Sequence, residues 1–285
     1  MRIDAPARVP LVDPTSIVAP EARLGSGVEI GPFCRVGPDA VLEDGVRLHS
    51  HVVIDGQTRI GARTEVYPFT MLGGAPQHLR YKGEPTRLEI GPDCVIREQV
   101  SIHRGTAHGG GVTVIGSDAF IMAQVHIGHD CQIGNHVVMA GNCTLAGHVS
   151  VGDYAIIGGV SGIHQFCRIG ERAMVGGCAA VPMDVIPFGS ALGNHARLGG
   201  LNLVGLKRSG LNRAAIHTLR AAFQDLFVSD AQTFRTRVEQ VADRYAESPE
   251  VAKIVAFIRA GGHRPILGAR ASGRETGDQS ASGEQ

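Results

Sequence analysis

The chain has 285 residues, of which 39 are glycine, none is tryptophan, and only 4 are tyrosine and 9 phenylalanine. Hydrophobic residues make up 43%, as in folded proteins, and the glycines follow no collagen-like period of three. The 27 basic and 27 acidic residues cancel, which excludes the basic excess typical of a nucleic-acid-binding chain. A core with so few aromatic rings has to be built from small and aliphatic residues, for which internal repeats are the usual solution.

A six-residue period of apolar residues runs through the first two thirds of the chain. Every sixth residue is apolar from Val12 to Leu72, which makes eleven residues, and again from Ile115 to Val181, which makes twelve. The residue two before each is small or β-branched, and the residue after it is often glycine. Such a period fits neither a helix nor an amphipathic strand, but one short strand and one turn, repeated. It predicts a parallel β-helix over 1–194, in which residues about 18 apart stack in successive coils.

The period breaks at about 73–89 and 103–113, so we expect two loops that leave the coil there. Loops that interrupt a regular solenoid more often carry function than structure. Residues 182–206 read as a connection that contains glycine and proline.

Helical spacing then predicts an α-helical domain over 195–262. One apolar face runs from Leu211 to Phe227, a second helix has Asp230 as its expected N-cap, and a third opens at Ser248-Pro249 and ends at Gly261-Gly262. Residues 263–285 are predicted to be a disordered tail.

Five of the six cysteines fall on the small inward position of the repeat, and Cys178 does not. We expect the five to be small buried hydrophobes, because no C-x-x-C pair suggests a zinc or redox site. They are Cys34, Cys94, Cys131, Cys143 and Cys167.

Polar residues suited to chemistry gather in the second run of repeats. His126, His129, His148 and His164 avoid the inward positions, and the 18-residue stacking places His129 under Gly147 and Gln165, and Asp130 under His148. We therefore expect these side chains on one stretch of outer surface. A histidine beside a carboxylate suits general-base catalysis near neutral pH.

Several strings follow one another in the order and spacing of a known family. Over about residues 8–262 the chain resembles the UDP-N-acetylglucosamine O-acyltransferases, which catalyse the first step of lipid A biosynthesis. These enzymes belong to the left-handed β-helix family, which the repeat also resembles. The strings are Gly83-Glu-Pro-Thr-Arg87, Ile102-His-Arg-Gly-Thr106, Ala123-Gln-Val-His-Ile-Gly-His-Asp130, Leu145-Ala-Gly-His-Val149, His164-Gln-Phe-Cys167, Gly193-Asn-His195 and Gly205-Leu-Lys-Arg208.

The resemblance implies transfer of an (R)-3-hydroxyacyl group from acyl carrier protein to the glucosamine 3-hydroxyl of UDP-N-acetylglucosamine. It implies His129 as general base, Asp130 as the group that holds its tautomer, and the Gly147 N–H as donor to the thioester oxygen. No metal and no cofactor is implied, because the acyl group arrives on the phosphopantetheine of the carrier protein.

The resemblance also assigns substrate contacts. His126, His148, His164 and Gln165 would bind sugar, acyl or pantetheine groups, while Asn202 and Arg208 match nucleotide contacts and Gly177 and His195 match positions that sense the acyl chain. Arg80 stands where the family has lysine. His78, Val204 and Ser209 replace an expected acid, glutamate and arginine, which leaves open whether the acceptor is N-acetylglucosamine or its 3-amino analogue.

The expected partners are acyl carrier protein, a UDP-sugar and two further copies in a homotrimer whose sites lie between subunits. From Val185 to Gln224 there are five basic residues and no acidic one, which independently favours an anionic partner. The sequence shows no signal peptide and no run long enough to span a membrane, so we expect a cytoplasmic protein without an integral membrane segment.

Two other interpretations stay open at this level. A zinc enzyme of the carbonic-anhydrase type on the same scaffold would use histidines such as His126, His129 and His148 as ligands. A pure scaffold or binding protein would need no particular residue at these outer positions.

Overall fold

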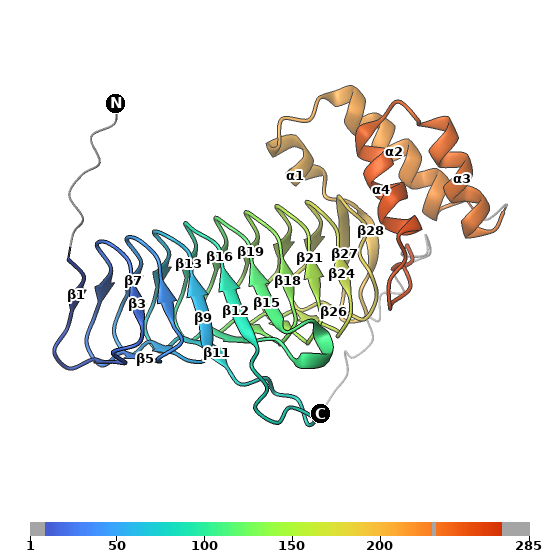
Figure 1. Ribbon diagram of the computed structural model, residues 1–285. Coiled ribbons are helices and arrows are strands. Elements are labelled where there is room, and N and C mark those ends of the chain that lie inside the picture. Colours follow the sequence, from blue (N-terminus) through green and yellow to red (C-terminus); the bar gives the residue numbers. More distant parts are fainter. Residues whose placement is uncertain (1–8, 230–231, 270–285) are drawn as a thin grey trace, which may run out of the picture.

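Short strands stacked coil upon coil form most of the molecule, and helices cover its C-terminal end (Figure 1). The computed structural model describes residues 9–229 and 232–269. The strands form three sheets that run the length of the solenoid, and neighbouring strands are parallel except for the last two of the first sheet.

Each coil contributes one strand to each sheet. The first sheet has 11 strands, β1 (Leu11–Val12), β4 (Glu29–Ile30), β7 (Arg47–Leu48), β10 (Glu65–Val66), β13 (Val95–Ile96), β16 (Phe120–Ile121), β19 (Val138–Met139), β22 (Ile156–Ile157), β25 (Met174–Val175), β27 (Gly189–Leu192) and β28 (Arg197–Leu201). The second has 9, β2 (Ile17–Val18), β5 (Arg35–Val36), β8 (Val53–Ile54), β11 (Met71–Gly74), β14 (Ser101–His103), β17 (His126–Ile127), β20 (Thr144–Leu145), β23 (Gly162–Ile163) and β26 (Ala180–Val181). The third has 8, β3 (Arg23–Leu24), β6 (Val41–Leu42), β9 (Gln57–Ile60), β12 (Arg87–Ile90), β15 (Val112–Ile115), β18 (Gln132–Ile133), β21 (Ser150–Val151) and β24 (Arg168–Ile169).

The register of these sheets has the predicted 18-residue step. Ile127 in β17 pairs with Leu145 in β20, which pairs with Ile163 in β23. These residues are 2% exposed or less, so the apolar residue of each hexad forms the core. The prediction of a hexapeptide-repeat β-helix is confirmed in its pattern of strands and burial.

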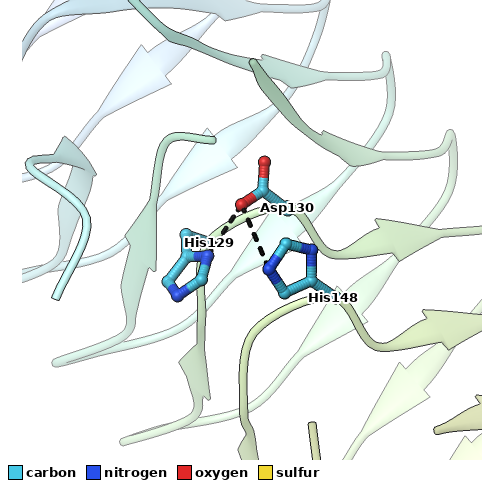
Figure 2. Close-up of side chains that lie close together, drawn as sticks. All are labelled: His129, Asp130 and His148. Carbon is cyan, nitrogen blue, oxygen red and sulfur yellow. Dashed lines mark hydrogen bonds and ion pairs between the residues drawn. The ribbon is translucent and has the colours of Figure 1, made fainter. Parts of the chain in front are cut away.

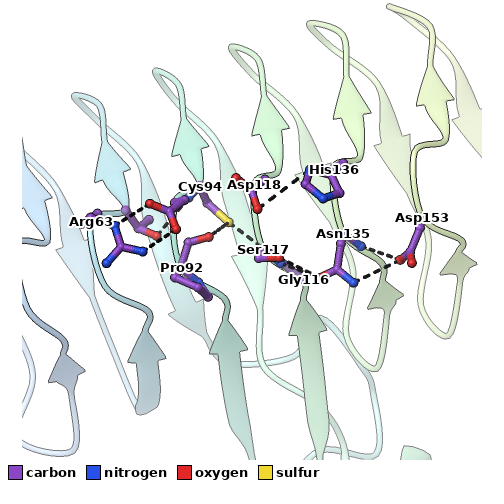
Figure 3. A network of polar contacts seen from close by, with 11 residues as sticks. Arg63, Pro92, Cys94, Gly116, Ser117, Asp118, Asn135, His136 and Asp153 are labelled. Atoms are coloured by element: carbon purple, nitrogen blue, oxygen red, sulfur yellow. Dashed lines mark hydrogen bonds and ion pairs between the residues drawn. The ribbon is translucent and has the colours of Figure 1, made fainter. Parts of the chain in front are cut away.

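Polar side chains stack with the same step along one corner of the solenoid (Figure 3). The Ser117 N–H and hydroxyl donate to Asn135 Oδ1 at 2.9 Å, and the Asn135 N–H donates to Asp153 Oδ1 at 2.7 Å. These hydrogen bonds satisfy backbone groups at turns that the sheets leave unpaired.

The two expected excursions leave the coil between β11 and β12 and between β14 and β15, where a short 3-10 helix, η1 (Ala107–Gly109), forms. Arg104 on the second excursion donates to the hydroxyl of Tyr81 on the first at 3.0 Å. The two loops therefore lie side by side next to the second sheet.

The helical end differs from the prediction at its start. Strand β28 extends the solenoid to Leu201, beyond the expected limit at residue 194, and pairs antiparallel with β27. Within the expected connection a further helix, α1 (Leu203–Arg208), begins after Asn202, whose side chain accepts from the Gly205 N–H. Neither the six-residue period nor the helical spacing predicts this helix. It has only six residues, too few to show a period, and the Asn202 cap defines its first turn.

Three longer helices follow, α2 (Arg213–Phe227), α3 (Phe234–Arg244) and α4 (Pro249–Arg259). The N-cap of α3 is Thr233, not Asp230, which itself lies outside the described residues. Ser248 caps α4, as the sequence predicts. In the described part of the chain, no helix is long and apolar enough to cross a membrane.

Residues 263–269, assigned to a disordered tail by sequence, return to the solenoid. Ile266 bridges to Asp184 and Ala269 to Leu198, and Leu267 is buried. The rest of the predicted tail, 270–285, lies outside the described residues.

The cysteine prediction is confirmed: five are buried and Cys178 is exposed. Burial raises the pKa of the thiols of Cys131, Cys143 and Cys167 to about 12, which keeps them protonated and inert.

Candidate functional site

The turn that follows β17 brings a histidine and a carboxylate together (Figure 2). His129 Nδ1 lies 2.7 Å from Asp130 Oδ2. Asp130 has a φ of +60°, the left-handed backbone that recurs at the corresponding turn position of other coils. With the carboxylate as acceptor, the proton of a neutral His129 ring resides on Nδ1 and leaves Nε2 as the basic nitrogen.

Asp130 is buried under the second excursion, which corrects the expectation that it lies on the outer surface. Its side chain is 0% exposed and accepts the N–H of Thr106 at 2.8 Å and the Thr106 hydroxyl at 2.7 Å. Burial opposes ionisation, but the hydrogen bonds from His129 and Thr106 prevail and lower the pKa of Asp130. The site therefore holds a fixed anion beside the histidine.

Gly147 stacks directly on His129, as the repeat predicts. A Cβ at this position would lie 2.6 Å from His129 Cε1, closer than any real contact, so only glycine leaves room for the ring. Among the described residues, none accepts the Gly147 N–H within the chain. That N–H is thus available to a ligand.

His148 completes the cluster from the next coil. Its Nε2 lies 3.7 Å from Asp130 Oδ2, and its ring meets that of His129 edge-on with centroids 5.0 Å apart. Burial, against the opposing charge of Asp130, lowers the pKa of His148, and the neighbouring histidines add to this effect. His148 is therefore kept neutral near pH 7.

Aromatic rings extend this cluster at both ends. His78, from the first excursion, contacts His129 with centroids 5.2 Å apart, whereas Phe166 stacks on His148 at 4.4 Å. His263 then lies 4.8 Å from Phe166. The structure thus places the predicted His78 in the cluster and adds Phe166 and His263, which we did not predict.

His126 occupies the adjoining face, one residue before the core position of β17. Ser101 and His126 share a hydrogen bond of 2.9 Å, and the ring of His103 lies 5.3 Å away. Burial, followed by the charge of His103, lowers the pKa of His126.

His164 and Gln165 lie one coil beyond Gly147, in the exposed turn after β23. Both contact Arg264, which donates to the Gln165 carbonyl at 3.0 Å and lies 2.6 Å from His164 Nδ1. Arg264 belongs to the segment that sequence patterns assigned to the tail, which explains why we did not predict it.

Of the remaining predicted residues, only Arg80 is joined to the cluster, because its N–H donates to His78 Nδ1 at 3.3 Å. In the part of the chain that the structure describes, no hydrogen bond, ion pair or ring contact links the cluster to the exposed Gly177, His195 or Arg208. Asn202 is buried, and its amide both caps α1 and donates to the Arg172 carbonyl at 3.0 Å.

One group in the described residues has the composition of a metal site. His129, Asp130 and His148 offer ligand atoms that all lie within 4.8 Å of one another. His129 Nδ1 is already engaged by the carboxylate, and His126, named as a ligand in the zinc interpretation, is not part of this group.

The repeat with its histidine–carboxylate pair defines the class of protein: this is a hexapeptide-repeat transferase. Residues 112–147 match the family model described as bacterial transferase hexapeptide (six repeats), and 184–267 match domain 2 of UDP-N-acetylglucosamine O-acyltransferase.

Similar proteins identify the family within this class. An acyl-[acyl-carrier-protein]–UDP-N-acetylglucosamine O-acyltransferase of Caulobacter vibrioides is 54% identical over 90% of this chain and 97% of its own, and one of Azorhizobium caulinodans is 50% identical over 90% and 95%. The solved UDP-N-acetylglucosamine acyltransferase of Campylobacter jejuni superposes with a TM-score of 0.86 at 36% identity, covering 91% of this chain and 100% of that one.

The chain belongs to the acyl-[acyl-carrier-protein]–UDP-N-acetylglucosamine O-acyltransferase family. This confirms the predicted family, its left-handed β-helix with a helical end, and its class of enzyme, an O-acyltransferase.

Proposed function

We propose that this protein transfers an (R)-3-hydroxyacyl chain from acyl carrier protein to the glucosamine 3-hydroxyl of UDP-N-acetylglucosamine, the first step of lipid A biosynthesis. The observation that carries the proposal is the His129–Asp130 pair beside Gly147. It occurs in a chain whose relatives are named as acyl-[acyl-carrier-protein]–UDP-N-acetylglucosamine O-acyltransferases.

A sugar hydroxyl is a poor nucleophile, so a base has to remove its proton as it attacks. His129 Nε2 is suited to this because Asp130 engages Nδ1 at 2.7 Å and stabilises the positive charge that develops on the ring. The buried anion is in place before the reaction and needs no reorganisation.

The thioester carbonyl oxygen becomes negative in the tetrahedral state and needs a donor. The Gly147 N–H stands next to His129 and is not used within the described chain, so we assign it this role. The electron pair on that oxygen then re-forms the carbonyl, and the carbon–sulfur bond breaks. The pantetheine leaves as a thiolate, which takes up the proton that His129 removed from the sugar hydroxyl.

The basic stretch supports an anionic partner. Arg197, Lys207, Arg208, Arg213 and Arg220 are all exposed, and none forms an ion pair among the residues that the structure describes. Both acyl carrier protein, which is acidic, and a nucleotide diphosphate would find positive charge there.

A homotrimer would explain why some predicted site residues lie away from the His129 cluster within one chain. Gly177, His195 and Arg208 do not contact the His129 cluster within one chain, and a neighbouring subunit would bring its own copies to that cluster. We propose a cytoplasmic homotrimer that needs no cofactor, with sites between subunits.

Turnover tests the proposal directly. Purified protein is mixed with acyl carrier protein loaded with 3-hydroxyacyl chains of several lengths and with UDP-N-acetylglucosamine or its 3-amino analogue, and products are identified by mass spectrometry. We expect an ester of UDP-N-acetylglucosamine and, because position 177 is glycine, acceptance of long chains. No transfer to either sugar would refute the proposal, and loss of activity together with stoichiometric zinc would favour the metalloenzyme.

A further inference from the structure

The segment after α4 is fixed to the solenoid at the coil that carries His164. We call Gly262–Leu267 the C-terminal strap. The Asp184 N–H donates to the Pro265 carbonyl at 2.9 Å, and the Leu267 N–H donates to the Asp184 carbonyl at 2.8 Å. Asp184 is fully buried and also binds Arg168. These contacts fix the middle of the strap to Asp184, which follows β26 on the coil next to that of His164 and Gln165.

The strap presents one guanidinium to two groups of that turn. Arg264 Nε donates to the Gln165 carbonyl at 3.0 Å, and Arg264 Nη2 lies 2.6 Å from His164 Nδ1. A guanidinium has donors only, so a hydrogen bond between Nη2 and Nδ1 requires an unprotonated Nδ1. The proton of His164 then has to reside on Nε2.

A weaker contact points the other way. His164 Nδ1 also lies 3.2 Å from the Gln165 carbonyl, and a proton on Nδ1 would be needed to make that hydrogen bond. Because Arg264 already donates to this carbonyl and approaches Nδ1 more closely, both groups are satisfied with the proton on Nε2.

We infer that Arg264 is a positioning residue, which fixes His164 as the Nε2–H tautomer and so makes it a hydrogen-bond donor. A donor at Nε2 suits an oxygen acceptor, such as a carbonyl or phosphate oxygen of the acyl donor or sugar nucleotide. The tautomer follows from the contacts alone, whereas its use in substrate binding rests on the proposed function.

The strap contacts the catalytic cluster by a second route. His263, next to Arg264, packs on Phe166 with centroids 4.8 Å apart, and Phe166 stacks on His148 at 4.4 Å with an interplanar angle of 10°. His148 in turn contacts His129. The strap therefore contacts the site at two points. Arg264 orients His164, and His263 is the last ring in the row that packs, through Phe166 and His148, on the proposed base His129.

The tautomer can be measured without substrate. In protein labelled with ¹⁵N in its histidine rings, two-bond ¹H–¹⁵N correlations report which ring nitrogen is protonated, and His164→Gln assigns the signals of His164. We expect an unprotonated Nδ1 in the wild type. In Arg264→Met, which keeps the length but removes all donors, the Gln165 carbonyl is free to accept from Nδ1, and the proton should shift toward that nitrogen.

Kinetics then test what the tautomer does. We expect Arg264→Met to lower kcat/KM by about tenfold, the effect of losing one charge-assisted hydrogen bond, and Arg264→Lys to restore part of it with its single donor. His164→Gln keeps an amide N–H near the Nε2 position. In that background Arg264→Met should change the rate by less than about twofold, because its effect passes through His164.

Arg259→Met is the matched control. Arg259 pairs with Glu239 on the exposed surface of the helices, so its loss should change neither the tautomer nor the rate. A wild-type His164 protonated on Nδ1, or a tautomer unaffected by Arg264→Met, would overturn the inference. A tautomer that shifts as expected in a protein that transfers no acyl group would support the inference and refute the proposed function.

Discussion

His129 and Asp130 are neighbours in sequence, yet one ring is partly open to solvent while the other side chain is wholly enclosed. The side chains are 12% and 0% exposed, and they meet at 2.7 Å. The second excursion makes this possible, because the N–H and hydroxyl of Thr106 bind the carboxylate beneath the loop while the imidazole stays partly exposed. A proton-accepting nitrogen thus stands at the surface with its counter-charge beneath it.

Replacing His129 should abolish most of the activity and leave the fold in place. We expect His129→Ala to lower the rate of acyl transfer by about 10²- to 10⁴-fold, the usual contribution of a general base. His136→Ala is the control, since this exposed histidine stacks on Tyr154 along another corner. Turnover near the wild-type rate in His129→Ala, with cooperative unfolding retained, would exclude the mechanism.

The carboxylate of Asp130 should matter for both rate and stability. In Asp130→Asn either tautomer of His129 can form, and we expect a loss of about 10²- to 10⁴-fold in rate. Weaker hydrogen bonds to Thr106 should cost on the order of 1–3 kcal/mol in the free energy of unfolding. Asp118→Asn, on an exposed corner, should change neither quantity.

The stability that Asp130 contributes should depend on pH. Its pKa is lowered in the folded protein, so the contribution is fully present above the ordinary value of 3.8 and is lost as the pH falls below it, through the folded-state value. Urea unfolding of the wild type and Asp130→Asn at several pH values measures this. A difference between them that grows on acidification would contradict the assignment.

A single methyl group at Gly147 should displace the proposed base. The new Cβ would lie 2.6 Å from His129 Cε1, so the ring has to turn away from Asp130 in Gly147→Ala. We expect a loss of about 10²-fold or more in kcat, because base and donor are both disturbed. In Gly268→Ala the added Cβ meets only Arg197 at 3.9 Å, and kcat should be unchanged.

The buried pair of Arg168 and Asp184 should dominate the stability of the helical end. Arg168 Nε lies 2.6 Å from Asp184 Oδ2, and its Nη1 donates to the Phe257 carbonyl of α4. Arg168→Met leaves the Asp184 charge without its cation, so we expect a loss of about 3–5 kcal/mol in urea unfolding. Arg63→Met, which breaks an exposed pair with Asp93, should cost below about 1 kcal/mol. Equal losses in the two variants would show that burial is not decisive.

Periodic parts of the structure followed from sequence, whereas contacts between distant segments did not. The hexad step places Gly147 over His129 and Asp130 under His148, because a coil of fixed length converts spacing into position. Thr106 and Arg264 approach these residues from segments outside the repeat, and no period relates them to residues 130 and 164. Even the burial of Asp130 depends on such a segment.

The 18-residue register also limits how this region can change in length. Inserting or deleting six residues between positions 129 and 147 would move every later hexad to the next face, separating Gly147 from His129. A whole coil could be gained or lost with the faces intact, whereas the excursions near 80 and 108 absorb any number of residues. In homologous genes, insertions and deletions within the coils should therefore occur in multiples of a full coil, with irregular ones confined to those two loops.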